Sequence, residues 1–380
     1  MRVNTSELIP IKLWLDDMEE GAMAQARHLA RLPFAFKHIA IMPNAHLGYG
    51  MPIGGVLATK GVIIPNAVGV DIGCGMLAMR TSIRKTTEEG LKKVMGKIRE
   101  AIPVGFKSHD TPQQGMPCQG FDTPIVAQHT TKARKSLGTL GGGNHFIELQ
   151  TDEEYLWVMI HSGSRNLGKQ VADHYNKVAR ELNKKWFSSV PADHDLAFLP
   201  LDSEEGRQYM REMNYCVEYA LKNRQCMLQR VKEILGQVFG YYNYETPINI
   251  AHNYARLENH FGQNVMVHRK GATSAKSGEL GIIPGSQGTA SYIVRGLGNP
   301  QSFNSCSHGA GRRMGRKQAK RELNLRAQQA FMQGIIHGIR TDEDLDEAPG
   351  AYKDIYRVME NQKDLVEIVT PLRPLAVVKG

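Results

Sequence analysis

The chain has 380 residues, 41% of them apolar, which is enough to build a sizeable buried core. Lysine and arginine outnumber aspartate and glutamate by 47 to 38, giving a formal charge of +9 that favours nucleic acid or phosphorylated partners over acidic ones. The five cysteines are scattered without a CxxC pair, and the sequence shows neither a signal peptide nor an apolar run of membrane-spanning length. We therefore expect a soluble, cytoplasmic protein.

The first third of the chain alternates short apolar segments with glycine-rich turns. Strands are predicted at 36–42 and 54–65, followed by the turn VGVDIGCG at 68–75. Residues 87–101 have an acidic first turn and helical spacing of apolar positions, which predicts a surface helix. Residues 103–136 lack periodicity and are rich in Gly, Pro, Gln and Thr, so they are predicted to form a flexible loop.

The remaining elements complete an α+β pattern. A buried strand is predicted at 156–161, and 203–238 is the longest helical pattern, with Ser203 as its N-cap. This helix could be an arm, a lid or scaffold. Glycine-rich loops, a basic helix and a short apolar tail follow. Because no repeat or linker interrupts the chain, residues 1–380 are predicted to form a single interwoven domain.

One group of residues has the chemistry of metal ligands. Cys74, His145, His161 and His252 each lie in a glycine-rich turn or at a strand end, and Asp71 precedes Cys74 by three residues. A single buried Cys or His is usually structural. Here, however, each histidine has Asn or Ser nearby that could orient its ring. Thiolate and imidazole favour zinc, iron or manganese over magnesium, and paired ions are a common way to hold a phosphoryl group.

A fourth histidine is a candidate nucleophile. His308 lies in NSCSHGAGRR at 304–313, where glycines leave the ring accessible and Arg312 and Arg313 can donate to phosphate. A neutral imidazole can attack an α-phosphate to form a phosphoramidate. The alternative from this motif alone is a histidine at a tight turn without a catalytic role.

The segment from Arg312 to Arg326 holds seven basic residues against one acid, Glu322. Such a run is usually the solvated face of a helix. Its position directly after His308 favours a track for an RNA backbone.

A phosphate-binding P-loop is excluded at GSRNLGK, residues 163–169. Gln170 stands where a P-loop needs Ser or Thr for magnesium, and Arg165 and Asn166 are bulky for such a loop.

Together these motifs resemble the RtcB family of RNA ligases. The likeness runs from residue 36 to the end of the chain through PNAVGVDIGCG, GTLGGGNHFIE, HSGSRNLG, AHNY, RKGA, IIPGSQGTASY, HGAGR, AYKD and VVKG, in that order. The resemblance implies β-sheets around a central metal and nucleotide cleft, flanked by helices. It also implies two Mn²⁺ ions bridged by Cys74, with Asp71 and His145 on one ion and His161 and His252 on the other.

The resemblance further implies that GTP guanylylates His308. GMP then passes to an RNA 3′-phosphate, formed directly or from a 2′,3′-cyclic phosphate, and a 5′-hydroxyl displaces it. Arg312 would lie near the phosphate, and the guanylate pocket would contain Asn144, Glu148, Ser286, Ser291, Tyr352 and Lys379. Glu148 can accept from the guanine amino edge. The implied partners are GTP and RNA with broken ends, rather than DNA or a membrane, with an RNA-repair or translation factor as a further partner.

Two positions depart from the family pattern. Asn44 replaces the Asp of an Asp-x-His motif, and an amide can neither accept a proton nor supply a full charge. Gln287 replaces Met beside the guanylate pocket, and the 103–136 segment is short for the family. These changes indicate a paralogue branch used for RNA repair rather than tRNA splicing.

Two other functions remain open at this point. The first is an RNA-binding factor that has lost sealing through Asn44; the full set of metal ligands and His308 argues against it. The second is a metal-dependent phosphoesterase that opens cyclic phosphates; the guanylate-pocket residues, including Lys379, argue against that.

Overall fold

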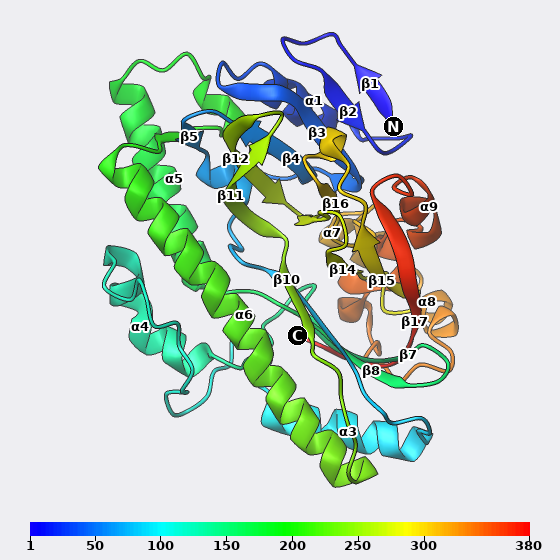
Figure 1. Cartoon of the computed structure of the whole chain (residues 1–380). Helices are drawn as coiled ribbons and strands as arrows, with labels where there is room; N and C mark the ends of the chain where they lie inside the picture. Colours follow the sequence, from blue (N-terminus) through cyan, green and yellow to red (C-terminus); the bar gives the residue numbers. More distant parts are fainter.

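Two β-sheets form the framework of the computed structural model, which describes residues 1–380 (Figure 1). The six-stranded sheet has the order β1 (Arg2–Asn4), β2 (Ile11–Leu13), β3 (Ala35–His46), β4 (Ile53–Thr59), β12 (Gln263–Lys270), β11 (Asn253–His260). The seven-stranded sheet has the order β10 (Ile248–Ala251), β6 (Gly75–Arg80), β8 (Leu156–Ser162), β7 (Phe146–Thr151), β17 (Val366–Lys379), β15 (Ser291–Gly296), β14 (Leu280–Ile283). Two short pairs complete the strands: β5 (Val62–Ile63) with β9 (Leu199–Pro200), and β13 (Ala272–Ser274) with β16 (Ser305–Ser307).

The helices cover these sheets, so the predicted α+β class is confirmed. The longer ones are α1 (Glu20–Ala30), α3 (Glu88–Ala101), α4 (Pro124–Ser136), α5 (Leu167–Lys185) and α6 (Glu204–Phe239). The shorter ones are α2 (Pro65–Val68), α7 (Arg316–Glu322), α8 (Leu325–Phe331), α9 (Ile355–Glu360), η1 (Ala192–His194), η2 (Pro300–Ser302), η3 (Asp342–Glu347) and η4 (Pro349–Ala351). None of them combines the length and apolar character needed to cross a membrane.

Helix α6 is the longest element and crosses the whole body of the molecule (Figure 1). Its N-terminus is capped as predicted, because the Ser203 hydroxyl accepts from the Gly206 N–H. Its apolar side, including Met227 and Val231, shares a core with Ile160 of β8 and with α3. The helix therefore packs along the seven-stranded sheet as scaffold, rather than projecting as an arm.

The predicted flexible loop at 103–136 is wrong for its second half, which forms α4. Ile125 and Val126 are buried against α6 in the same apolar cluster as Tyr219. The carboxylate of Glu212, on α6, accepts from the backbone N–H groups of Ile125 at 2.8 Å and Val126 at 3.4 Å. Helix α4 is thus capped by a residue more than eighty positions away, a signal that no local pattern contains.

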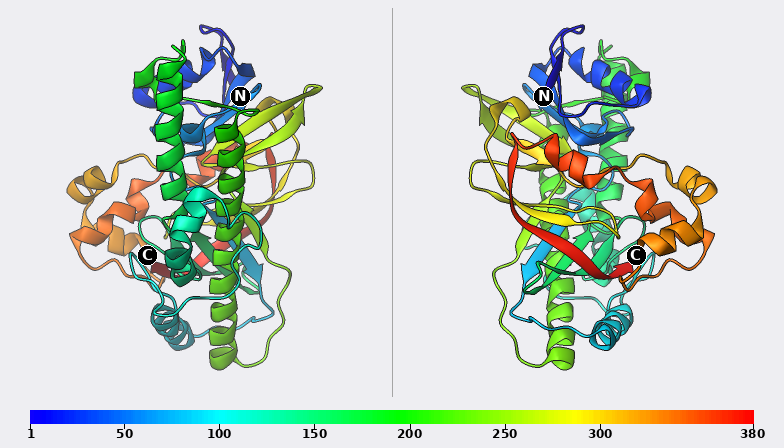
Figure 2. Two further views of the ribbon diagram at one scale, coloured as in Figure 1. Left: turned by 90° about the vertical axis from the view of Figure 1, so that its left-hand side faces the viewer. Right: turned by 90° about the vertical axis from the view of Figure 1, so that its right-hand side faces the viewer.

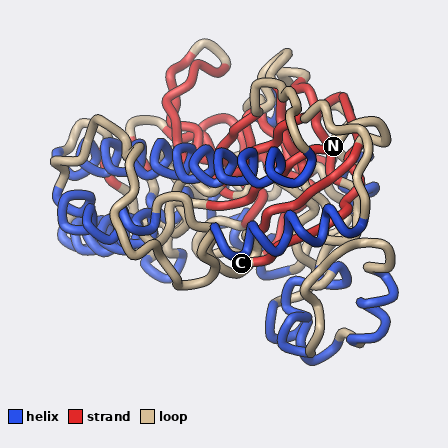
Figure 3. The backbone as a smooth tube through the Cα atoms, turned by 90° about the horizontal axis from the view of Figure 1, so that it is seen from below, coloured by secondary structure: helices blue, strands red, loops and turns tan.

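Helices α7 and α8 with η3 form a small lobe on one side of the body, seen in orange in Figure 2 and from below in Figure 3. The lobe has its own apolar cluster, formed by Met332, Ile339, Leu345 and Ala348. This cluster packs η3, whose last residue is Glu347, against the other helices of the lobe.

Candidate active site

Four neighbouring strands of the seven-stranded sheet bring the predicted metal ligands to one edge. In the order β10-β6-β8-β7, each strand is antiparallel to the next. The ends of β10 and β8 and the starts of β6 and β7 therefore lie at the same edge. These positions are occupied by His252, His161, Cys74 and His145.

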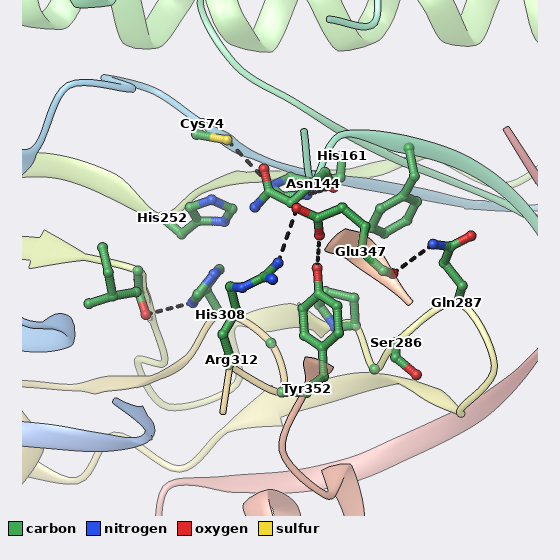
Figure 4. Close-up of a pocket in the computed structure, with 18 of the residues that line it drawn as sticks. Cys74, Asn144, His161, His252, Ser286, Gln287, His308, Arg312, Glu347 and Tyr352 are labelled. Carbon is green, nitrogen blue, oxygen red and sulfur yellow. Dashed lines mark hydrogen bonds and ion pairs between the residues drawn. The ribbon is translucent and has the colours of Figure 1, made fainter. Parts of the chain in front are cut away.

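We call the side chains of Asp71, Cys74, His145, His161 and His252 the metal cluster, meaning the group of candidate ligands. The ligand atoms of Cys74, His145 and His161 converge, and Figure 4 shows Cys74, His161 and His252 beside one another. Cys74 Sγ lies 3.5 Å from His145 Nε2 and 3.3 Å from His161 Nε2. Asp71 Oδ2 lies 3.3 Å from His145 Nε2. The ring centroids of His161 and His252 are 5.2 Å apart. The structure thus brings together all five side chains that the sequence singled out.

Backbone carbonyls fix which ring nitrogens face Cys74. Nδ1 of His145 lies 2.9 Å from the Leu140 oxygen, and Nδ1 of His161 lies 3.0 Å from the Asn144 oxygen. Since a carbonyl can only accept, each Nδ1 carries a proton and each Nε2 is turned toward Cys74. Burial lowers the pKa of His161, which keeps its ring neutral.

The rest of the donor set also fits a divalent cation. Nδ1 of His252 is buried without a hydrogen-bond partner, and burial lowers the pKa of this ring as well. Burial, followed by the nearby Asp71 carboxylate, raises the pKa of the Cys74 thiol well above its usual value. A bound cation would be ligated by the neutral His252 ring and would stabilise the Cys74 thiolate against the effect of burial. One sulfur, several imidazoles and a carboxylate suit a borderline ion such as Mn²⁺, Fe²⁺ or Zn²⁺.

Two residues of α6 that no sequence pattern indicated support this cluster from the side of the helix. Arg224, fully buried, donates to the carbonyls of Ser162 at 2.8 Å, Gly73 at 3.2 Å and Ile250 at 3.3 Å. These carbonyls adjoin or lie close to three of the ligands in the chain. Asn223 donates to the carbonyls of Thr139 and Gly163 at 3.1 and 3.2 Å. The sequence of α6 has the pattern of an ordinary amphipathic helix, so it does not indicate this role for Arg224 or Asn223.

The segment rejected as a P-loop, residues 163–169, holds two loops near the metal cluster together. Arg165 and Asn166 adopt positive φ values of 53° and 68°, and α5 begins only after them. Arg165 donates to the Gly105 carbonyl and to the Thr139 hydroxyl, each at 2.9 Å. The guanidinium therefore joins two loops, and the segment makes no cradle of backbone N–H groups.

His308 follows β16 and faces the metal cluster, with its ring centroid 4.5 Å from that of His252. Its Nδ1 lies 2.7 Å from the Gly271 carbonyl oxygen, so this nitrogen carries the proton and Nε2 keeps the lone pair. Burial lowers the pKa of His308 to about 4, which leaves the ring neutral. Gly271 has a φ of +62°, and a Cβ there would lie 2.4 Å from Ile53, so only glycine places this carbonyl.

Asn44 is buried on β3 directly behind His308. Its Nδ2 donates to the same Gly271 carbonyl at 2.9 Å and lies 2.7 Å from His308 Nδ1. Its Oδ1 is buried without a partner. The residue that departs from the family pattern therefore contacts the group that positions His308.

A cavity of about 370 Å³ lies between His308, the metal cluster and the lobe. The residues predicted for the guanylate pocket that line it are Asn144, Glu148, Ser286, Tyr352 and Lys379, together with Arg312. Ser291 instead lies behind the wall, where its hydroxyl accepts from Gln150 at 3.1 Å and from the Gly285 N–H at 3.3 Å. Burial raises the pKa of Glu148 to about 8.

Glu347, which no sequence motif indicated, is the central charge of this cavity (Figure 4). Its carboxylate lies 3.1 Å from Arg312, 3.0 Å from Arg316 and 3.9 Å from Lys379. It also accepts from the Tyr352 hydroxyl. Its backbone carbonyl accepts from Gln287 at 2.8 Å, so the second departure from the family pattern joins the 284–291 loop to the lobe. The acidic run EDLDE around Glu347 looks solvent-exposed in the sequence, which hid this role.

The basic segment from Arg312 to Arg326 is not a uniform positive track. Arg312 and Arg316 line the cavity. Lys320 forms an ion pair with Glu343, and Arg321 with Glu322. Only part of the segment's charge is therefore directed at the site.

The fold and the site define a protein in which a cluster of thiol, imidazole and carboxylate ligands adjoins a polar cavity of mixed charge that holds a neutral histidine. The sequence matches the family model described as tRNA-splicing ligase RtcB over residues 25–121 and 114–380. It is 40% identical over 410 residues to the RNA-splicing ligase RtcB of Escherichia coli (strain K12), covering 99% of this chain and 98% of that protein. It is 32% identical over 459 residues to the tRNA-splicing ligase RtcB of Thermococcus kodakarensis, covering 98% and 95%. The chain belongs to the RtcB family, as its motifs predicted.

Proposed function

We propose that this protein is a GTP-dependent RNA ligase that joins an RNA 3′-phosphate or 2′,3′-cyclic phosphate end to a 5′-hydroxyl end through guanylylated His308. The observation that carries the proposal is the hydrogen bond from His308 Nδ1 to the Gly271 carbonyl, 2.7 Å long. It leaves Nε2 as the free nucleophilic nitrogen of a ring that lines the cavity. The names of the relatives, RNA-splicing and tRNA-splicing ligase, support the same reaction.

In the first step, the Nε2 lone pair of His308 attacks the α-phosphorus of GTP. The bond from the α-phosphorus to the bridging oxygen breaks, and pyrophosphate leaves with that electron pair. Arg312 and Lys379 line the same cavity and can offset the charge that develops on the phosphates. Because the ring is neutral before the attack, no proton has to leave Nε2.

In the second step, an oxygen of the RNA 3′-phosphate attacks the same phosphorus, the P–N bond to His308 breaks, and RNA-ppG forms. A cyclic phosphate end is first opened by water to give the 3′-phosphate. In the third step, a 5′-hydroxyl attacks the RNA phosphorus of RNA-ppG, loses its proton and expels GMP. Activation therefore exchanges a poor leaving group for GMP.

Asp71, Cys74, His145, His161 and His252 are the residues that would hold the Mn²⁺ ions of the proposed reaction. Bound ions would neutralise phosphate charge and lower the pKa of the attacking hydroxyl. The side chains contribute the arrangement: imidazole rings whose orientation is fixed by backbone carbonyls, held beside His308.

The guanine base would lie against Glu148, which lines the cavity. An ionised carboxylate accepts from the N1–H and amino groups of guanine, whereas adenine offers it no such pair of donors. Ser286, Tyr352 and Lys379 complete the pocket wall. Asn44 and Gln287 are the positions that would adapt the enzyme to repair of damaged RNA, since both contact the catalytic machinery.

The test is covalent labelling. The protein is incubated with Mn²⁺ and GTP labelled at the α-phosphate, then denatured and separated by electrophoresis. We expect an acid-labile label that disappears in His308→Ala and persists in His174→Ala, a control histidine on α5. An RNA-binding factor would stay unlabelled, and so would a phosphoesterase, which would open cyclic-phosphate RNA but never join it to a 5′-hydroxyl end. Absence of label therefore refutes the proposal.

A further inference from the structure

A second and larger hollow, of about 960 Å³, adjoins the site cavity. One wall is the loop after β3, with Leu47 and Tyr49, and the opposite wall is the segment 312–318. The two hollows share His46, Arg312 and Arg316, so the larger one leads directly to the reacting groups. We call the larger hollow the entry groove.

The loop that forms the first wall is rigid, yet it turns two apolar side chains outward. Leu47 is 52% exposed and Tyr49 is 74% exposed. Several backbone groups below them are hydrogen-bonded: Gln25 both accepts from and donates to Gly48, at 3.1 and 2.6 Å. The ammonium of Lys270, a buried side chain, donates to the Tyr49 carbonyl at 2.6 Å. The ring of Tyr49 is therefore presented by a preorganised loop rather than by a flexible one.

Lys270 also connects this loop to the chemistry. It directly precedes Gly271, whose carbonyl positions His308. Next to Tyr49, Gly50 has a φ of +67°, and a Cβ there would lie 2.5 Å from the Asp195 carbonyl oxygen. Lys270, the last residue of β12, thus both holds the Tyr49 carbonyl and directly precedes the residue whose carbonyl positions the nucleophile.

The charge of the groove fits a polyanion. Its basic residues are Arg312, Arg313, Arg316 and Lys353, and its acids are Asp17 and Glu19. Glu19 is already engaged by the Leu47 N–H. Arg313 is exposed and uses only its Nε, which donates to the Gly350 carbonyl at 2.8 Å. Its terminal nitrogens remain free for a ligand phosphate.

From these features we infer that the entry groove binds the single-stranded nucleotides next to a reacting RNA end, with a base stacked on Tyr49 and a backbone phosphate held by Arg313. This inference rests on the proposed function for the chemistry of its occupant. An exposed aromatic ring beside free guanidinium groups is the pairing that binds single strands, because every base has a stacking face. A duplex would keep those faces covered.

The experiment measures binding directly, so that it does not depend on sealing. Fluorescence anisotropy follows two short RNAs, one ending in a 3′-phosphate and one beginning with a 5′-hydroxyl, each labelled at its other end. We expect Tyr49→Ala to weaken binding of at least one strand by on the order of tenfold, and Tyr49→Trp to restore it. In Arg313→Ala, the slope of log affinity against log salt should fall by about 0.7, the value for one phosphate contact on a single strand.

Matched controls are Tyr241→Ala, an even more exposed ring after α6, and Arg180→Ala on α5. Labelling of His308 by GTP should be unchanged in both groove variants, because neither side chain lines the nucleotide cavity. The strand that loses affinity is the occupant. The inference is overturned if neither strand responds, if duplex RNA responds equally, or if labelling falls in parallel with binding. Absence of labelling in the unaltered protein would refute the ligase proposal and leave the binding result to decide this one.

Discussion

The two ends of the site cavity are built by different means. At the metal end, the ligands lie at the ends of adjacent strands, and backbone carbonyls orient the rings of His145 and His161. At the nucleotide end, three loops meet around a single carboxylate, Glu347, and its ion pairs with Arg312 and Arg316. Hydrogen-bonded backbone is insensitive to salt, whereas partly exposed ion pairs are screened by it. The metal end is therefore preformed, and the nucleotide end is adjustable.

The largest effect is expected from a variant that removes the support of the metal end. In Arg224→Met, three buried carbonyls lose their donor, and we expect Mn²⁺ affinity to fall by about 10–100-fold, the usual cost of losing an outer-sphere partner. Isothermal titration calorimetry with Mn²⁺ would measure this. Arg230→Met on the same helix is the control, because Arg230 donates to the Gly138 carbonyl instead. Equal affinity in the two variants would show that the strand ends do not depend on α6.

The second change acts at the nucleotide end. Glu347→Gln removes the counterion of Arg312, Arg316 and Lys379, so GTP should bind about threefold more tightly and with steeper salt dependence. Guanylylation of His308 should nevertheless slow by roughly tenfold, because Arg312 is no longer held in place. Rapid-quench labelling separates the two effects. Glu343→Gln, in the same 3₁₀ helix, is the control; a loss of Mn²⁺ affinity in Glu347→Gln would contradict the independence of the two ends.

A third prediction uses pH to examine Glu148. Burial raises its pKa to about 8, so the protonated acid predominates below that pH and the carboxylate that accepts both guanine donors predominates above it. GMP affinity should therefore rise with pH, by about tenfold between pH 6.5 and 8.5. Metal-free fluorescence titrations at several pH values would test this. In Glu148→Gln the rise should vanish, and a rise of the same size in that variant would assign it to another group.

The smallest effect is expected at Asn44. In Asn44→Asp, a carboxylate would stand 2.7 Å from His308 Nδ1 and strengthen the lone pair on Nε2, so guanylylation should accelerate by about threefold. Single-turnover labelling would measure the rate. Asn44→Ala separates charge from hydrogen bonding, since it removes the donor to Gly271 without adding charge. A slower Asn44→Asp would indicate that the amide is already the better partner for this carbonyl.

The success of sequence reasoning also differs between the two ends. Cys74, His145, His161 and His252 were found because each lies within a compact motif at a strand end, where residue type and spacing carry the information. Glu347 was missed because its partners come from three other segments and its own segment reads as a solvated acidic run. Helix α4 was missed for the same reason: its N-terminal cap, Glu212, belongs to α6. Local pattern predicts what backbone geometry dictates, and it cannot predict side-chain pairs that form only in the folded chain.

Because β17 contributes to both the sheet and the cavity, the site can form only after this strand has been synthesised. This strand, the last one along the chain, pairs with both β7 and β15 in the interior of the seven-stranded sheet, and Lys379 is its final residue. A nascent chain that has not yet released residues 366–379 from the ribosome has the strands that bear the metal ligands, but its sheet is still divided. Such a chain lacks the lysine and cannot close the cavity around a nucleotide. The proposed guanylylation of His308 would thus require that residues 366–379 have joined the sheet.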